Sequence, residues 1–543
     1  MTVAADTPVG AAAPGDRAAA RIAGAATLIA VLTVASRVAG FARTWVFAHT
    51  VGSGDLGGMY LAANTIPNII FEIVAGGALA GLVVPLLAGP LAAGDRDGVR
   101  RTVSALLTWT LTALVPLALV LWLAAGPVIG LLAPNADPGL HEAGADMLRA
   151  FAPQVPLYGI GIVLTGVLHA HRRFAWPVLA PLLSSLTVIG VYLLFAATAG
   201  ATPALADVDG RELAILALGT TAGVVVLSLC LLIPVSRLRL GLRPTYRVAP
   251  GERRRIGSLA FAGLATVAAQ QVALLVTIRL ALAVDGATNS LYNFAQTLFL
   301  LPWAVLAVPA ATAAYPAIAT AHATADTATL RATTARTGRA VLLLSGLGAA
   351  GLAAVAKPAA GLMLADPQQV GTLAAAVTAF APGLLGYGLT ALHQRTLYAV
   401  GANRLAALGV GAGWAVTIGA ALWLSAALPE SERAVALGAA NAVGMTVMGL
   451  ALALAVRARL GRMALSGLPR ALLAASVAGL AGAAAGVEAG RVVSGPTPGI
   501  MGLIGQGMLS GGVSLAVFLG VCALLDLPDL RPLIERVARR GRR

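Results

Sequence analysis

The sequence has little charge, few aromatic side chains and almost no cysteine. Charged residues make up 11% of its 543 residues, against about 25% in ordinary soluble domains. This shortage excludes a soluble globular enzyme, a disordered chain and a nucleic-acid-binding domain. The two cysteines, Cys230 and Cys522, both lie inside apolar runs. We therefore expect neither a disulfide framework nor a metal site.

Apolar residues fill most of the chain instead. The residues AVILMFWYC account for 58%, glycine adds 63 positions, and the mean hydropathy is +0.87. Long unbroken runs of Ala, Leu, Val and Gly predict helices, because a membrane barrel would show alternating strands of about ten residues. We therefore predict an all-α polytopic membrane protein with about 14 transmembrane helices of about 20 residues or more. The predicted spans are 22–50, 57–91, 102–127, 147–170, 177–199, 213–234, 257–284, 291–316, 340–364, 370–400, 405–427, 434–455, 471–487 and 501–525.

The basic residues support this topology. Their excess gives a net charge of +15, but they separate the apolar runs and form no single nucleic-acid-binding stripe. With 14 spans, 28 of the 37 basic residues fall on the side of the termini, five on the other side and four within spans. This bias predicts a multi-pass membrane protein with both termini cytoplasmic. The seven arginines of the 235–257 loop and the basic tail are predicted to meet anionic lipid headgroups.

A weak internal repeat predicts two lobes. Pro67 lies about ten residues into the second span and Pro302 about eleven into the eighth. Paired proline-interrupted helices point to a transporter with its site between two halves, although proline is common in membrane helices anyway. We predict alternating access between the lobes. The predicted segments are a disordered N-terminus (1–21), an N-lobe (22–234), a basic linker (235–256), a C-lobe (257–455), two further helices (456–526) and a basic tail (527–543).

Charges inside predicted spans mark candidate functional residues, because a charge in the bilayer core costs about 2.5–3.5 kcal/mol. The first span holds Arg37 and Arg43, and the second holds Glu72. Counted from the intervening loop, Arg37 and Glu72 lie at similar depth, so they are predicted to pair, either for structure or for function. Arg43 either borders a cavity or extends to the headgroups.

Several local motifs carry a family resemblance. They are Ser36-Arg37-Val38-Ala39-Gly40-Phe41-Ala42-Arg43, Ile66-Pro67-Asn68, Gly77-Ala78, Val84-Pro85-Leu86-Leu87-Ala88, Arg173-Phe174-Ala175-Trp176-Pro177, Ala180-Pro181, Gln270 with Thr277-Ile278, Leu301-Pro302, Pro316 and Arg395-Thr396-Leu397-Tyr398-Ala399 with Gly401. Together they cover nearly the whole chain. The sequence resembles the MurJ/MviN-type lipid II flippases, a family within a superfamily of two-lobed exporters.

The resemblance implies a transporter of the bacterial plasma membrane, not an enzyme. Such a protein would move undecaprenyl-pyrophosphate-linked peptidoglycan precursor (lipid II) from the inner to the outer leaflet by alternating access. It implies a cationic central cavity and a groove along the last two helices for the lipid tail. Partners would be the lipid substrate and proteins of cell-wall synthesis. No cofactor is expected, but transport could be coupled to the membrane potential or to an ion.

Three positions depart from the family pattern. Gly58 stands where the family usually has an acidic residue, and Glu72 and Thr297 stand where it usually has arginines. Arg279 is predicted to replace the cation missing at Thr297, because both lie at similar depth on neighbouring helices; otherwise it extends to the outer headgroups. The predicted substrate-binding residues are Arg37, Arg43, Arg279, Glu72, Asn68, Gln270 and Thr297.

Two other functions stay open from the sequence. One is a different exporter of the same fold, either a polysaccharide-unit flippase or a cation-coupled drug antiporter. Glu72 favours this alternative, because a membrane carboxylate can carry a coupling proton. The other is a non-transporting scaffold paralogue within a cell-wall complex.

Overall fold

The protein is a bundle of long helices. The computed structural model describes residues 14–74, 80–246, 252–493 and 499–525, without the side chains of 14–30, 80–82 and 252–266. Within these ranges every extended regular element is helical. The all-α membrane fold predicted from the apolar runs is therefore confirmed.

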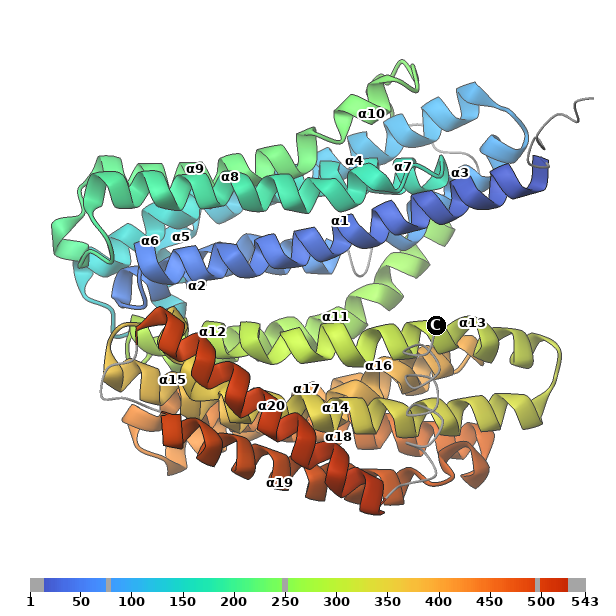
Figure 1. Cartoon of the computed structure of the whole chain (residues 1–543). Coiled ribbons are helices and arrows are strands. Elements are labelled where there is room, and N and C mark those ends of the chain that lie inside the picture. Colours follow the sequence, from blue (N-terminus) through green and yellow to red (C-terminus); the bar gives the residue numbers. More distant parts are fainter. Residues whose placement is uncertain (1–13, 75–79, 247–251, 494–498, 526–543) are drawn as a thin grey trace, which may run out of the picture.

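The N-terminal half of the chain forms one group of helices, shown in blue to green in Figure 1. Its elements are α1 (Pro14–Thr50), α2 (Asp55–Ile73), α3 (Ala80–Ala92), α4 (Arg96–Leu123), α5 (Ala125–Leu132), α6 (Pro138–Phe151), α7 (Gln154–Ala170), α8 (Ala175–Ala199), η2 (Leu205–Asp207), α9 (Gly210–Leu229) and α10 (Leu232–Ser236).

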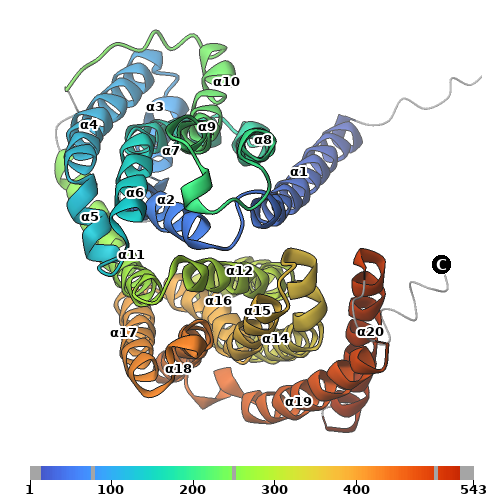
Figure 2. The same ribbon diagram turned by 90° about the vertical axis from the view of Figure 1, so that its left-hand side faces the viewer.

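The C-terminal half forms the second group, shown in light green to red. Its elements are α11 (Glu252–Leu282), α12 (Gly286–Pro302), η3 (Trp303–Ala307), α13 (Val308–Ala323), α14 (Thr327–Met363), α15 (Pro367–Phe380), α16 (Gly383–Ala399), α17 (Asn403–Ala427), η4 (Glu430–Glu432), α18 (Arg433–Leu460), η5 (Arg462–Leu465), α19 (Leu468–Val493) and α20 (Ile500–Leu525). Figure 2 shows α19 and α20 on the flank of this half, where both pack against α14.

The predicted number of 14 spans is not confirmed. Ten helices of the described residues are long and apolar enough to cross a membrane, or 11 if the bent pair α15 and α16 is one span. These eleven coincide with eleven predicted spans. The other three predicted spans, 22–50, 57–91 and 257–284, each include residues whose side chains or backbone lie outside the described part.

Two predicted boundaries are wrong at the N-terminal ends of helices. α1 begins at Pro14, so residues 14–21 are helical and not disordered; proline at the first helical position and the three alanines at 18–20 favour a helix. A helix also precedes the span predicted at 147–170, because Pro138 starts α6. Residues 1–13 and the tail 527–543 lie outside the described residues.

The two halves share a hydrophobic core at one end. The cluster that includes Phe47 of α1 and Phe294 of α12 joins both halves, and these two rings meet edge to face at 6.1 Å. Two further clusters each stay within one half, around Leu168 in the first and around Leu397 in the second. The halves are therefore packed together where α2 and α12 begin, and no hydrophobic cluster of the described residues joins them at the opposite end.

Candidate functional site between the two halves

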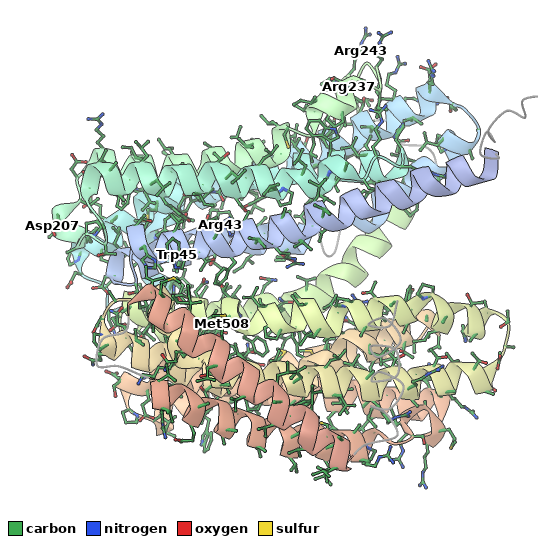
Figure 3. The ribbon with its side chains drawn as sticks, viewed as in Figure 1. Arg43, Trp45, Asp207, Arg237, Arg243 and Met508 are labelled. Carbon is green, nitrogen blue, oxygen red and sulfur yellow. The ribbon has the colours of Figure 1, made fainter. Side chains whose placement is uncertain are left out.

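Three tyrosines of the N-terminal half lie within electrostatic range of Arg43. The Arg43 charge lies close enough to Tyr60, Tyr158 and Tyr192 to act on all three hydroxyl groups. Tyr60 shares hydrogen bonds of 2.8 Å with Tyr192 and with Thr220. The arginine itself is exposed, whereas Tyr60 and Tyr192 are buried. Figure 3 shows its place on α1.

Asn68 belongs to the same group. Its side-chain oxygen accepts a 2.7 Å hydrogen bond from the Tyr158 hydroxyl, and its amide donates to the Asn64 carbonyl at 2.9 Å. Phe71, one helical turn further, lies 4.7 Å from the Tyr158 ring. The structure therefore brings together two of the predicted site residues, Arg43 and Asn68, through Tyr158.

The predicted ion pair between Arg37 and Glu72 is not formed. Both side chains are exposed, and neither has an ion pair within the described part of the chain. The reason is the rotation of α2, which turns Phe71 toward its own half. Glu72 lies about 100° further round the helix, and its charge acts on Tyr387 of α16 in the other half.

Tyr387 belongs to a group of aromatic residues in the C-terminal half, beside the π-helical turn η3 between α12 and α13. Its ring stacks on Trp303 at 4.4 Å, and the Trp303 indole donates to the Tyr387 carbonyl at 3.1 Å. Trp303 follows Pro302 and begins the π-helical turn η3, and such turns are frequent at functional sites. The Glu72 charge thus acts across the boundary between the halves on one ring of the stacked pair Trp303 and Tyr387.

Gln270 and Thr297 lie elsewhere in the C-terminal half. Gln270 lines a cavity of about 170 Å³ together with Thr277, Tyr292 and Asn441. Thr297 donates to the Asn293 carbonyl in its own helix at 2.9 Å. The structure does not group either residue with Arg43, and their roles in substrate binding stay predictions.

The closest contact between the halves joins the starts of α2 and α12. The Gly286 N–H donates to the Asp55 carboxylate at 2.8 Å, and the Asn289 amide donates to the Gly58 carbonyl at 2.8 Å. A Cβ atom at Gly58 would overlap the Gly286 carbonyl. We call this group of residues, Asp55, Gly58, Gly286 and Asn289, the α2–α12 contact. In this conformation, position 58 therefore has no room for the acidic side chain usual in the family.

Further hydrogen bonds join the halves around this contact. The Trp45 indole donates to the Leu362 carbonyl at 2.9 Å, and Ser53 donates to Gln369. Arg279 donates to the Leu131 carbonyl at the end of α5. Arg279 is thus placed between α5 and α11, and no interaction with Thr297 is found among the described residues. That it supplies the cation missing at Thr297 stays a prediction.

A cavity of about 1180 Å³ lies beside the α2–α12 contact, and it is acidic. Its walls carry six carboxylates, and Asp146 among them is paired with Arg149 at 2.6 Å. These carboxylates repel a pyrophosphate. They are Asp55, Asp137, Glu142, Asp146, Asp209 and Asp366. The arginine-bearing surface of α1 is therefore the better place for an anionic substrate.

The sequence prediction missed the tyrosines and the residues of the α2–α12 contact. One signal was present: the chain has only eight tyrosines, and a tyrosine inside a span needs a partner for its hydroxyl group. No such signal exists for Gly58 or Asn289, because their importance arises from the approach of a distant helix.

Two helical halves that are packed together at one end, with charged and polar side chains between them, define a membrane transporter of the two-lobed exporter class. The family model described as lipid II flippase MurJ matches residues 47–489. The chain therefore belongs to the MurJ family of lipid II flippases.

Individual relatives agree with this assignment. A probable lipid II flippase MurJ from Synechocystis is 30% identical over 32% of this chain and 33% of its own length. The lipid II flippase MurJ from Burkholderia cenocepacia is 26% identical over 51% of this chain and 53% of its own. The aligned segments thus span from a third to about half of the length of these relatives.

Solved structures share the fold. A lipid II flippase MurJ in an inward closed conformation superposes with a TM-score of 0.74 at 15% identity, over 94% of this chain and all of that one. An inward-facing multidrug resistance MATE family transporter superposes with a TM-score of 0.64 at 16% identity, over 80% and 94% of the two chains.

Proposed function

We propose that this protein is a transporter that moves lipid II from the inner to the outer leaflet by alternating access. The observation that carries the proposal is Arg43, an exposed cation of the first helix whose charge acts on Tyr60, Tyr158 and Tyr192. A planar guanidinium can donate two parallel hydrogen bonds to a phosphate. Arg37, one and two-thirds turns away on α1, would supply a second cation for the pyrophosphate.

Membership of the flippase family supports this substrate over the alternatives. A drug antiporter, a polysaccharide-unit flippase and a non-transporting scaffold are not favoured. Glu72 remains the candidate for coupling, because it is an acidic residue within a predicted span and its charge acts on Tyr387 of the other half. We propose that transport is driven by the membrane potential or by an ion, and that Glu72 is the residue that responds to this driving force.

The positive-inside distribution supports a cytoplasmic location of both termini. With this orientation, the α2–α12 contact closes the outer side. Arg237 and Arg243 project from the end of α10 and the segment after it (Figure 3), where they would meet anionic headgroups. Proteins of cell-wall synthesis are proposed partners at the outer side, where the product is delivered.

Complementation of a strain depleted of its own lipid II flippase tests the proposal. We expect the wild-type protein to restore growth and lipid II export. Arg43→Ala should abolish both at unchanged protein level, while Arg43→Lys retains part. Arg100→Ala is the matched control, because Arg100 forms an exposed pair with Asp97. Failure of the wild-type protein, or full activity of Arg43→Ala, would contradict the proposal.

A further inference from the structure

A second polar cavity lies away from the boundary between the halves. It has a volume of about 520 Å³ and separates α14 and α15 from α19 and α20. Six of its 14 lining residues are alanine, so small side chains form much of its wall. The polar lining residues are Lys357, Thr378, Arg491, Gln506 and Ser510.

The charged residues that line this cavity are both cations. Lys357 is the only lysine of the chain and is exposed, while Arg491 pairs with Glu488 on its own helix at 2.6 Å. No carboxylate is found among the described residues that line the cavity. Lys357 lies six residues before the end of α14, about 9 Å along the helix axis.

Ser510 provides an independent sign of a ligand. Its side chain is 1% exposed, and its hydroxyl oxygen has no hydrogen-bond partner among the described atoms. The hydroxyl lies against Gly490, where a Cβ atom would overlap it. A buried hydroxyl normally has a partner, and this one lines the same cavity as the two cations.

We propose that this cavity binds the phosphate group of an anionic phospholipid. Lys357 and Arg491 would neutralise the phosphate, and Ser510 would donate to one of its oxygens. The alanine wall leaves room for the glycerol and the upper acyl chains, and the outer surface of α20 is apolar, with Met508 70% exposed. The family resemblance implies only an apolar groove along the last two helices, so a phosphate site is an addition that does not depend on the transported substrate.

Titration of the purified full-length protein tests the site, with bound lipid counted by native mass spectrometry. The probes are dioleoyl phosphatidylglycerol, dioleoylglycerol, which lacks the phosphate, and inorganic phosphate. We expect phosphatidylglycerol to bind at least about tenfold more tightly than dioleoylglycerol. Lys357→Gln should weaken phosphatidylglycerol about tenfold and Ser510→Ala about threefold to fivefold, the range of charged and neutral hydrogen bonds.

Two further variants keep the test decisive. Ala375→Leu fills the exposed wall of the cavity without changing charge, and it should also weaken phosphatidylglycerol. Arg404→Gln removes an exposed cation at the opposite end of the bundle and should leave binding unchanged. Equal binding to the wild type, Lys357→Gln and Ala375→Leu would overturn the proposal. Inorganic phosphate that binds as tightly as phosphatidylglycerol would overturn the assignment to a lipid.

Discussion

Asn289 of α12 donates a hydrogen bond from its side-chain amide to the backbone carbonyl of Gly58 in α2, at a distance of 2.8 Å. The bond is buried and joins residues 231 positions apart in the sequence. A neutral hydrogen bond contributes about 1 kcal/mol net. If transport proceeds by the proposed alternating access, the halves separate here, and the bond then stabilises one of the two states of the transport cycle.

Asn289→Ala should therefore shift the protein toward the state that is open at the α2–α12 end. A loss of about 1 kcal/mol changes the ratio of the two states about fivefold. Spin labels on cysteines at Ala206 and Ala365 measure this opening, because these exposed residues line opposite sides of the acidic cavity. The native Cys230 and Cys522 are replaced by alanine for this purpose.

The control for this measurement is Asn403→Ala, an exposed asparagine at the start of α17. It should leave the distance distribution unchanged. An identical distribution for Asn289→Ala and wild type would show that the bond does not hold the halves together.

Gly58→Ala should impair transport, because a Cβ atom at this position overlaps the Gly286 carbonyl. Overpacking of this kind costs about 1–3 kcal/mol, and here the cost falls on the closed state alone. Gly54→Ala is the matched control, because nothing lies within 4 Å of a Cβ atom there. Complementation of the depleted strain measures both, and equal growth of the two variants would reject the steric argument.

The sequence predicts the long apolar helices well and the contacts between them poorly. α8 (Ala175–Ala199) and α20 (Ile500–Leu525) lie within two residues of their predicted bounds, because hydrophobicity alone determines which residues enter the bilayer. The depth of a residue in the membrane can also be estimated by counting residues along its helix, and the similar depths of Arg37 and Glu72 suggested that they pair. The sequence does not show which side of a helix faces its neighbours, so the effect of Glu72 on Tyr387 could not be predicted.

Asp326 should make the start of α14 sensitive to acid. Its carboxylate accepts a 2.9 Å hydrogen bond from the Thr329 N–H, and this bond holds the pKa of Asp326 below its usual value of 3.8. A carboxyl group with a lowered pKa in the folded protein stabilises the fold at every pH above the pKa of the unfolded chain. This contribution is lost as the pH falls through the pKa of the folded protein.

Asp326→Asn separates this effect from the other carboxylates. Asparagine caps a helix about as well as aspartate but does not titrate. Between about pH 5 and about pH 3, the thermal unfolding temperature in detergent should fall less for Asp326→Asn than for wild type. Asp326→Ala, which lacks a cap, should be less stable at every pH. Parallel pH curves for wild type and Asp326→Asn would contradict the prediction.

Arg279 distinguishes a contact between the halves from a substitute cation in the substrate site. It donates to the Leu131 carbonyl at the C-terminal end of α5, where the helix dipole favours a positive charge. Asn135, just beyond α5, joins the same region through a 2.9 Å hydrogen bond to the Ala283 carbonyl.

If Arg279 serves this contact, Arg279→Ala and Asn135→Ala should both lengthen the distance between the labels at Ala206 and Ala365. Adding Thr297→Arg to Arg279→Ala should then fail to restore complementation, because a cation on α12 cannot replace a bond to α5. If Arg279 instead replaces the cation missing at Thr297, the double variant should regain transport and Asn135→Ala should be silent. The hydrogen bond to Leu131 favours the first outcome.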